Sequence, residues 1–272
     1  MAEQRIIYYT DELKDEFSTF TTTPPVIDGN YDYDDSSFLK QLRRFFVYRI
    51  MIIPIAWLHS QIAFHRKTVG REKLRPYRKQ GIFLYGNHTQ PVGDAFLQAC
   101  LTYPRTNYVV VHPNNLMVPF FGRLIPALGA LPLPDTIPAF KNFKEAIAKR
   151  IKKGHPVVIY PEAHIWPWYT GIRPFADTSF AYPVQLNAPV FCFTNTYQKR
   201  RFGRKPRMVT YIDGPFFPDP NLSPREQKKQ LRDTVYEHMV QSARNSNVEM
   251  IKYIRRPEDT DKEEEKKEEE DG

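Results

Sequence analysis

Short apolar runs recur along the chain, and longer amphipathic stretches separate them. Five runs have the length and the β-branched or aromatic content of strands: Ile82 to Tyr85, Tyr108 to His112, Val157 to Tyr160, Val190 to Thr194 and Met208 to Ile212. Strands that alternate with helices usually form one sheet with helices packed on it. The pattern therefore predicts an α/β fold with a mixed, mostly parallel sheet flanked by helices.

Two of the intervening stretches have helical spacing. The first runs from about Phe140 to Lys153 and is followed by Gly154, which is placed to end it. The second begins at Ser223, a good helix cap, and has Glu226 positioned to complete a capping box. The chain has 12 glycines and no dinucleotide fingerprint or phosphate loop, so the usual nucleotide-binding motifs are excluded.

The formal net charge of +8 is unevenly distributed. Both ends are acidic: residues 1–37 hold 9 acidic and 2 basic residues, and residues 257–272 hold 10 acidic and 3 basic residues. The 219 residues between them hold 12 acidic and 34 basic residues. We therefore divide the chain into an acidic N-terminal segment (1–37), a membrane-associating helical segment (38–69), a catalytic domain (70–256) and a disordered acidic tail (257–272). The basic middle favours an anionic partner such as nucleic acid, phospholipid head groups or a phosphorylated cofactor.

An uncharged run of 15 residues lies between Arg49 and His65. It is shorter than the ~20 residues that cross a bilayer, and basic and aromatic residues flank it. This favours a helix lying in the head-group layer of an anionic phospholipid membrane, peripheral or monotopic; a buried core helix is the alternative. We expect the protein to lie on the cytoplasmic side of that membrane. The chain has only two cysteines, Cys100 and Cys192, which cannot form a disulfide framework, and its first residues do not resemble a secretory leader.

A polar segment, residues 86–94, follows the first predicted strand. It contains His88 and Asp94, and a histidine oriented by a carboxylate is a ready general base. Positions six apart on a helix are separated by ~240°, so the two side chains meet only if a loop, bent at Pro91 and Gly93, joins them and leaves Asp94 at the start of a helix. The alternative is that Asp94 merely caps that helix and His88 is a surface turn residue.

A second polar cluster, beginning at Glu162, follows the strand that ends at Tyr160. If the two strands are parallel neighbours, His88 and Glu162 lie at the same edge of the sheet. Glu162 is then placed to position the hydroxyls of a polar acceptor, and Arg173 to bind a phosphate. A zinc site formed by His88, Asp94, Glu162 and His164 lacks the usual ligand spacing, so we expect no metal.

Four segments, in order, resemble the conserved blocks of the membrane-associated glycerolipid acyltransferases, of which the lysophosphatidic acid acyltransferases are the best-known type. The first is Asn87-His88 through Asp94, the second Pro119 to Arg123 through Ala130, the third Tyr160-Pro161-Glu162, and the fourth Ala188-Pro189-Val190. Together they extend from about Gly70 to Thr194, behind the basic, aromatic segment.

The resemblance implies transfer of a fatty acyl chain from acyl-CoA or acyl carrier protein, as co-substrate and with no other cofactor, to the free hydroxyl of a lysophospholipid such as 1-acylglycerol-3-phosphate. It assigns His88 as the general base, Asp94 as the residue that orients it, and Glu162 to the acceptor head group. No covalent acyl-enzyme is required, because a thioester is already activated.

The sequence also departs from the family pattern. Five residues rather than four separate His88 from Asp94, and Ala163, His164 and Ile165 replace the glycine, threonine and arginine of the third block. Arg123 and Arg173 are the nearby candidates to bind the acceptor phosphate in place of the missing arginines.

The alternatives are a transferase for a different lyso-lipid, a lipid hydrolase, or a non-catalytic protein that binds anionic membranes. We expect no nucleic acid partner, because the basic residues follow no recognised binding module. The oligomeric state is left open.

Overall fold

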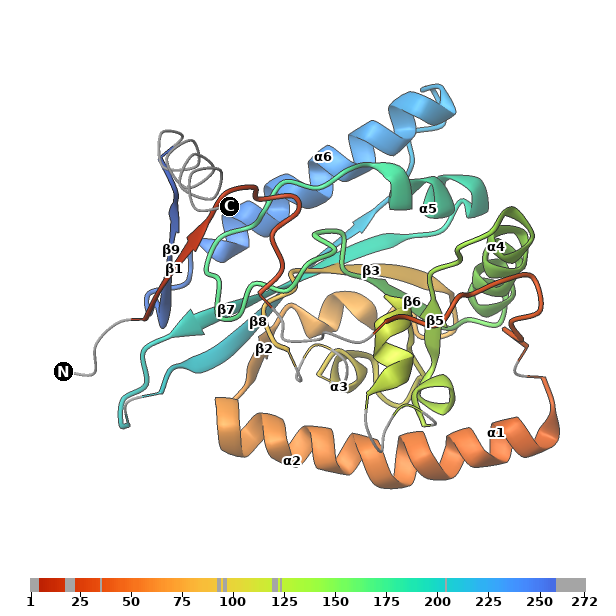
Figure 1. Ribbon diagram of the computed structural model, residues 1–272, viewed down its shortest axis with the longest axis horizontal. Coiled ribbons are helices and arrows are strands. Elements are labelled where there is room, and N and C mark those ends of the chain that lie inside the picture. Colours follow the sequence, from red (N-terminus) through yellow and green to blue (C-terminus); the bar gives the residue numbers. More distant parts are fainter. Residues whose placement is uncertain are drawn as a thin grey trace, which may run out of the picture.

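The computed structural model describes residues 5–17, 23–34, 36–91, 94, 97–118, 122, 124–203 and 205–257. Its centre is a seven-stranded sheet in the order β2-β8-β7-β3-β6-β4-β5 (Figure 1). All neighbouring strands are parallel except β7 and β8, which confirms the mixed, mostly parallel sheet. The strands are β2 (Lys67–Val69), β3 (Ile82–Gly86), β4 (Tyr108–Val111), β5 (Ala130–Pro132), β6 (Pro156–Ile159), β7 (Val190–Gln198) and β8 (Arg207–Phe216).

All five predicted strands form, as β3, β4, β6, β7 and β8. The sequence did not predict β2 and β5, the two edge strands of this sheet, which have three residues each. Segments this short carry too few side chains to show a strand period, and pairing with a longer neighbour is what orders them.

The helices α4 (Ile137–Lys152), α5 (Ala181–Leu186) and α6 (Pro224–Ala243) cover one face of the sheet (Figure 1). Apolar side chains from α4 and α6 join alternate residues of β3, β6 and β7 in the largest core cluster. Thr136 caps α4 and Ser223 forms the expected capping box with Glu226 at the start of α6, so both helix starts follow from local sequence.

The other face of the sheet carries η2 (Arg71–Leu74) and α3 (Ala99–Thr102), with the turns η3 (Pro113–Met117) and η4 (Ile125–Leu128) nearby. The turn η5 (Thr178–Phe180) leads into α5. The expected helix beginning at Asp94 is wrong in extent, because only Ala99–Thr102 is helical and residues 95 and 96 lie outside the described part. The carboxylate of Asp94 is instead engaged with the loop that precedes it.

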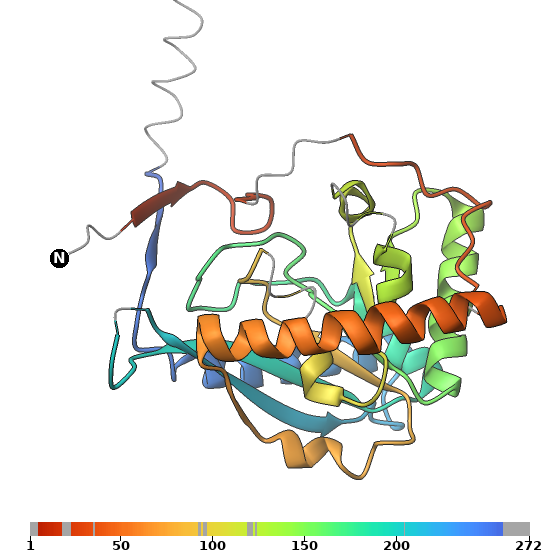
Figure 2. The same ribbon diagram turned by 90° about the horizontal axis from the view of Figure 1, so that it is seen from below.

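One continuous helix of 27 residues, Phe38–Phe64, runs along this second face (Figures 1 and 2). It consists of α1 (Phe38–Arg44), the π-helical stretch η1 (Phe45–Ile52) and α2 (Ile53–Phe64). The helix continues through Pro54, whose missing N–H and ring are accommodated by the wider π turns before it. It spans about 40 Å at the usual rise, so by length and composition it is long and apolar enough to cross a membrane. The length expected from the 15-residue uncharged run was therefore too short, because the apolar helix has 27 residues.

The acidic N-terminal segment packs against the domain. Its strand β1 (Arg5–Tyr9) pairs in parallel with β9 (Ile251–Arg255) in a separate two-stranded sheet. Ile27 and Tyr33 join the main core cluster beside α4. The acidic tail, from residue 258 onward, lies outside the described residues.

Candidate active site

His88 and Asp94 form a hydrogen-bonded pair in the loop after β3. The imidazole Nδ1 lies 2.9 Å from Asp94 Oδ2. The His88 side chain is 18% exposed and that of Asp94 only 1%, so the histidine faces solvent and the carboxylate lies behind it. The five intervening residues thus permit the contact. Of the two residues expected to bend the loop, Pro91 lies in a turn and Gly93 is not among the described residues.

Backbone N–H groups hold the Asp94 carboxylate in place. Thr89 and Gln90 each donate to Asp94 Oδ2 at 2.8 Å, and the Asn195 amide approaches Oδ1 at 3.5 Å. A carboxylate that already accepts two N–H bonds receives a further proton donor from His88, so the imidazole proton lies on Nδ1. The lone pair is then on Nε2, which has no hydrogen-bond partner among the described residues. An imidazole with a free Nε2 and an oriented Nδ1 has the geometry that a general base requires.

Tyr160, at the end of the neighbouring strand, orients the imidazole. Its ring stacks on His88 with centroids 4.5 Å apart, and its hydroxyl donates to the Asp94 carbonyl at 2.6 Å. Burial raises the pKa of Tyr160 well above its usual value, so the hydroxyl remains a donor. Below this loop, the Phe193 ring occupies the space where a side chain at Gly86 would point. Any larger residue at position 86 would displace the start of the loop.

Glu162 connects the two polar clusters. Strands β3 and β6 are parallel neighbours with Tyr85 opposite Ile159, as the sequence interpretation required. Glu162 Oε2 accepts the His88 backbone N–H at 3.2 Å, and Oε1 accepts the Arg173 N–H at 3.2 Å. Burial raises the pKa of the Glu162 carboxyl, and Arg173 acts in the opposite direction. The two strand-end clusters therefore form one site.

Arg173 is 1% exposed and its guanidinium is held inside the loop that follows β6. It pairs with Glu162 Oε2 at 3.4 Å, donates to the carbonyls of Glu12 and His164, and stacks over the Trp166 ring at 4.9 Å. These contacts involve both terminal nitrogens of the guanidinium, whereas the buried Nε has no hydrogen-bond partner among the described residues. In this arrangement Arg173 supports Glu162, and phosphate binding by Arg173 stays a prediction. Arg123, the other candidate, lies outside the described residues.

The segment 9–17 covers the loop in which the third block departs from the family pattern. The Glu16 carboxylate accepts the Ile165 N–H at 3.2 Å and lies 3.2 Å from His164 Nδ1. The Trp166 indole donates to the Asp15 carbonyl at 2.9 Å. Ala163, where the family has glycine, adopts φ +63°, the left-handed region that glycine tolerates best. The altered residues thus belong to a contact between the N-terminal segment and the site.

From the sequence, Tyr160 was named only as the end of a strand and the first residue of the third block, without a role in the site, and Asn195 was not named. Asn195 lies on β7, its N–H donates to Asn87 Oδ1 at 2.8 Å, and its carbonyl accepts from Asn87 Nδ2 at 3.0 Å. The run of buried polar residues Thr194-Asn195-Thr196 in β7 is the signal that could have found it. No group of three or more potential metal ligands occurs among the described residues, and His88 and Asp94 pair with each other.

Two comparisons relate the chain to known proteins. Residues 65–194 match a protein-family model described as Acyltransferase. The fold resembles the crystal structure of PlsC, a 1-acyl-sn-glycerophosphate (LPA) acyltransferase from Thermotoga maritima, with a TM-score of 0.51 and 15% identity; the match covers 77% of this chain and 97% of that chain. No curated protein matches the chain in sequence.

A parallel sheet that carries a histidine and a carboxylate at its strand ends, within a segment that matches this family model, defines an acyltransferase domain. Residues 65–194 form an acyltransferase domain, and the protein is an O-acyltransferase rather than a non-catalytic membrane-binding protein. The resemblance read from its four blocks is confirmed.

Proposed function

We propose that this enzyme transfers a fatty acyl chain from acyl-CoA or acyl carrier protein to the free hydroxyl of a lysophospholipid, with 1-acylglycerol-3-phosphate as the first candidate acceptor. The 2.9 Å contact between His88 Nδ1 and Asp94 Oδ2 carries the proposal, because it leaves Nε2 as a base. The likeness in fold to an LPA acyltransferase supports the choice of acceptor.

In the proposed reaction, His88 Nε2 removes the proton of the acceptor hydroxyl as its oxygen attacks the thioester carbonyl. A C–O bond forms, the C–S bond breaks, and the imidazolium returns the proton to the departing thiolate. Asp94 keeps the imidazole oriented and stabilises its positive charge during the step. Glu162 acts as a positioning residue, since its carboxylate binds the backbone N–H of His88.

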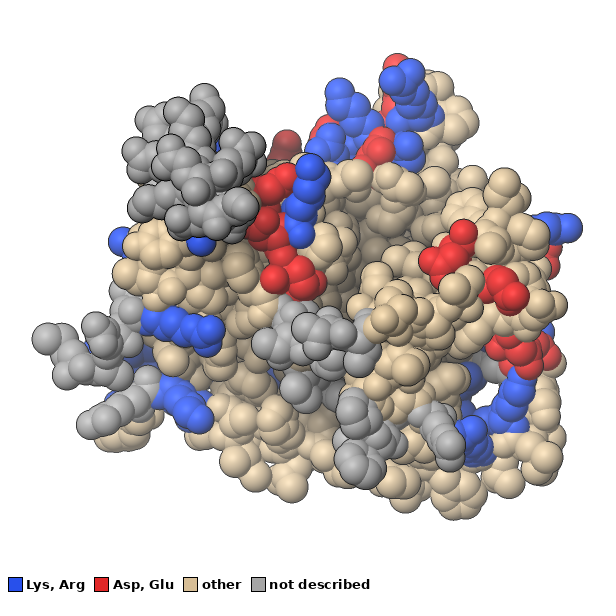
Figure 3. All heavy atoms as spheres, viewed as in Figure 1, with Lys and Arg blue, Asp and Glu red and all other residues tan. Residues whose placement is uncertain are grey.

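The membrane is proposed as the place where the enzyme meets its lipid substrate. One stripe of the helix Phe38–Phe64 packs on the domain through Tyr48, Ile52 and Phe64. Eleven large apolar residues of the same helix are exposed: Phe38, Leu39, Leu42, Phe45, Phe46, Ile50, Met51, Ile55, Trp57, Leu58 and Ile62. In Figure 3 the edge of the molecule along which this helix runs is almost free of charge except near its α1 end. A helix held along the domain in this way suits a monotopic enzyme, and two free cysteines, Cys100 and Cys192, suit the cytoplasmic side of the bilayer.

One observation favours a lysophospholipid acceptor other than 1-acylglycerol-3-phosphate. The Glu16 carboxylate contacts the third-block loop at the N–H of Ile165, where family members carry an arginine. A negative charge there opposes a phosphomonoester and suits a head group without net negative charge.

The deciding experiment is an acyl-transfer assay with the purified protein in detergent micelles. A labelled acyl-CoA or acyl carrier protein is supplied with lysophosphatidic acid, lysophosphatidylcholine or lysophosphatidylethanolamine. We expect acylated phospholipid as the product and a rate lower by about 10² to 10⁴ for His88→Ala. Equal rates for the wild type and His88→Ala would disprove the base, and free fatty acid as the only product would indicate a hydrolase.

A further inference from the structure

A second polar pocket lies beside the long helix, outside the site described above. Its volume is about 560 Å³, which is within the range of small-molecule sites. It is lined by Gln41, Arg44, Phe45, Arg49, Thr106, Tyr108, Lys153 and His155. The helix α1–η1 provides one wall, and the segments that enter β4 and β6 provide the other.

The lining is cationic. It contains Arg44, Arg49, Lys153 and a histidine, and the described residues that line it include no aspartate or glutamate. Neither Arg49 nor Lys153 forms an ion pair with another described residue, and both side chains are exposed. Several cations gathered around one hollow, two of them exposed, produce a field that attracts an anion.

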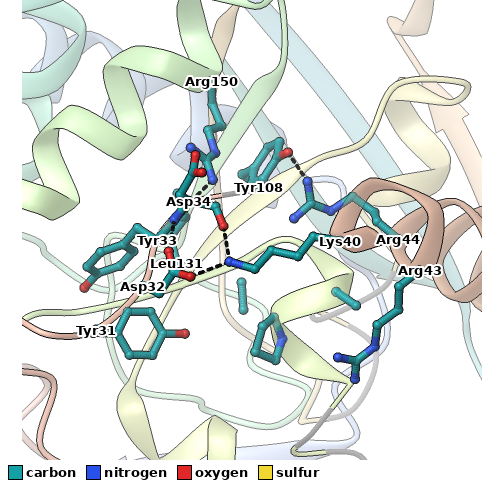
Figure 4. A pocket seen from close by; sticks show the side chains of 13 residues that line it. Tyr31, Asp32, Tyr33, Asp34, Lys40, Arg43, Arg44, Tyr108, Leu131 and Arg150 are labelled. Carbon is teal, nitrogen blue, oxygen red and sulfur yellow. Dashed lines mark hydrogen bonds and ion pairs between the residues drawn. The ribbon is translucent and has the colours of Figure 1, made fainter. Parts of the chain in front are cut away.

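The pocket on the opposite side of Arg44 contains acidic residues. A smaller pocket of about 120 Å³ there contains Asp32 and Asp34, and Lys40 binds both residues (Figure 4). The acidic N-terminal segment thus forms an ion pair with Lys40 on this side of α1. On the other side no described acidic residue lines the pocket.

The cationic pocket is ordered by the residues at its base. The Arg44 guanidinium lies 4.9 Å from the Tyr108 ring centroid and donates to the Tyr108 hydroxyl (Figure 4). The His155 ring packs edge-on against Tyr108 with centroids 5.3 Å apart. Two of the polar groups are therefore held in place before a ligand binds, which lowers the entropy cost of binding.

The pocket is distinct from the acyl-transfer site. Tyr108 is the first residue of β4, and His155 comes directly before β6. His88 and Glu162 follow the last residues of β3 and β6. Because these strands are parallel, the two sites lie at opposite ends of the sheet. An anion in the cationic pocket is therefore not the reacting acceptor.

Phe45 connects the pocket to the apolar surface of the long helix. It lines the pocket and is 46% exposed, next to exposed Phe46. A ligand with a phosphate in the pocket and apolar chains along this surface satisfies both features. We propose that the pocket binds the phosphate of an anionic phospholipid in the membrane on which the enzyme rests, an inference that depends on the proposed membrane association.

Vesicle binding tests the site. Arg49→Gln/Lys153→Gln removes two exposed cations from the pocket, and Arg225→Gln/Lys229→Gln removes two exposed cations from α6, on the opposite side of the molecule (Figure 1). Wild type and the α6 variant should bind vesicles containing phosphatidylglycerol more tightly than vesicles of phosphatidylcholine alone. The pocket variant should lose about 10-fold or more of that preference, since a cation near an anionic surface contributes about 1 kcal/mol.

Equal losses in the two variants, or no loss in the pocket variant, would overturn the site. Inorganic phosphate is compared with sodium chloride at matched ionic strength to distinguish the source of the anion. The preference for anionic vesicles should be the same in both; a specific loss with phosphate would assign the pocket to the free anion and overturn the lipid.

Micellar acyl transfer separates this inference from the proposed function. The pocket variant should retain wild-type transfer in micelles, whereas His88→Ala should lose transfer and keep the vesicle preference. If the wild type binds vesicles without preferring anionic lipid, only the pocket inference fails. If it binds no vesicles, the proposed membrane association fails as well.

Discussion

The carboxylate of Glu162 accepts the backbone N–H of His88 at 3.2 Å, and so connects two loops that lie 74 positions apart in the chain. Two further backbone bonds support the same contact, from Trp166 to the His88 carbonyl and from Trp168 to the Thr89 carbonyl. The proposed base therefore depends on the loop after β6 for its position. The consequence is that changes in that loop should alter catalysis without touching the imidazole.

Replacing Asp94 with asparagine should lower kcat by about 10² to 10⁴, because an amide no longer stabilises the imidazolium. The Asn Oδ1 can still accept backbone N–H bonds, so the fold should persist. The measurement is the steady-state rate of acyl transfer beside the unfolding midpoint.

The double variant His88→Ala/Asp94→Asn provides the control for that prediction. Residues that act as one unit give non-additive losses, so the double variant should be no slower than His88→Ala alone. Losses that multiply would show that Asp94 acts independently of the histidine.

Arg173→Met should destabilise the protein by about 3 to 5 kcal/mol, because the buried Glu162 carboxylate then lacks its cation. Adding Glu162→Gln removes the unpaired charge and should restore part of this loss. Urea unfolding of both variants gives the comparison. A single variant within about 1 kcal/mol of wild type would mean that the pair contributes little.

Ala163→Gly should leave the fold intact and stabilise it by up to about 1 kcal/mol, because Ala163 has φ +63° and glycine adopts this conformation without strain. Ala163→Val is the matched opposite change and should destabilise the protein, since a β-branched residue is worse in that region. Thermal unfolding midpoints decide the order. A lower midpoint for glycine than for valine would contradict the argument.

Removal of residues 1–17 should expose the aromatic cluster around Trp166, which is fully buried beneath Tyr9 and Phe17. The indole N–H would also lose its bond to the Asp15 carbonyl. We expect a red shift of tryptophan emission and a lower unfolding midpoint. Trp166→Phe is the control, because the shift should be much smaller in its truncated form. Unchanged emission on truncation would show that the segment does not shield Trp166.

The positions of the site residues were predictable where they follow strong periodic strands. The apolar runs ending at Tyr85 and Tyr160 indicated which polar segments lie at strand ends, and the sheet confirmed that they share an edge. The roles of Arg173 and the N-terminal segment were not predictable. The sequence around an arginine does not show whether its guanidinium is exposed or buried. The Glu12 carbonyl that accepts a hydrogen bond from Arg173 lies 161 positions away in the chain.

The sequence alone determined the α/β class, the five main strands, the helices α4 and α6 with the cap of α6, and the resemblance to the acyltransferases, because periodicity, capping and short motifs are local properties of the chain. Tertiary structure decided which groups meet: the fold places His88 against Asp94 and Glu162, buries Arg173 against Trp166, and gathers cations beside the long helix. These contacts join residues that are distant in sequence or separated by an irregular loop, and no local pattern encodes the distance between them.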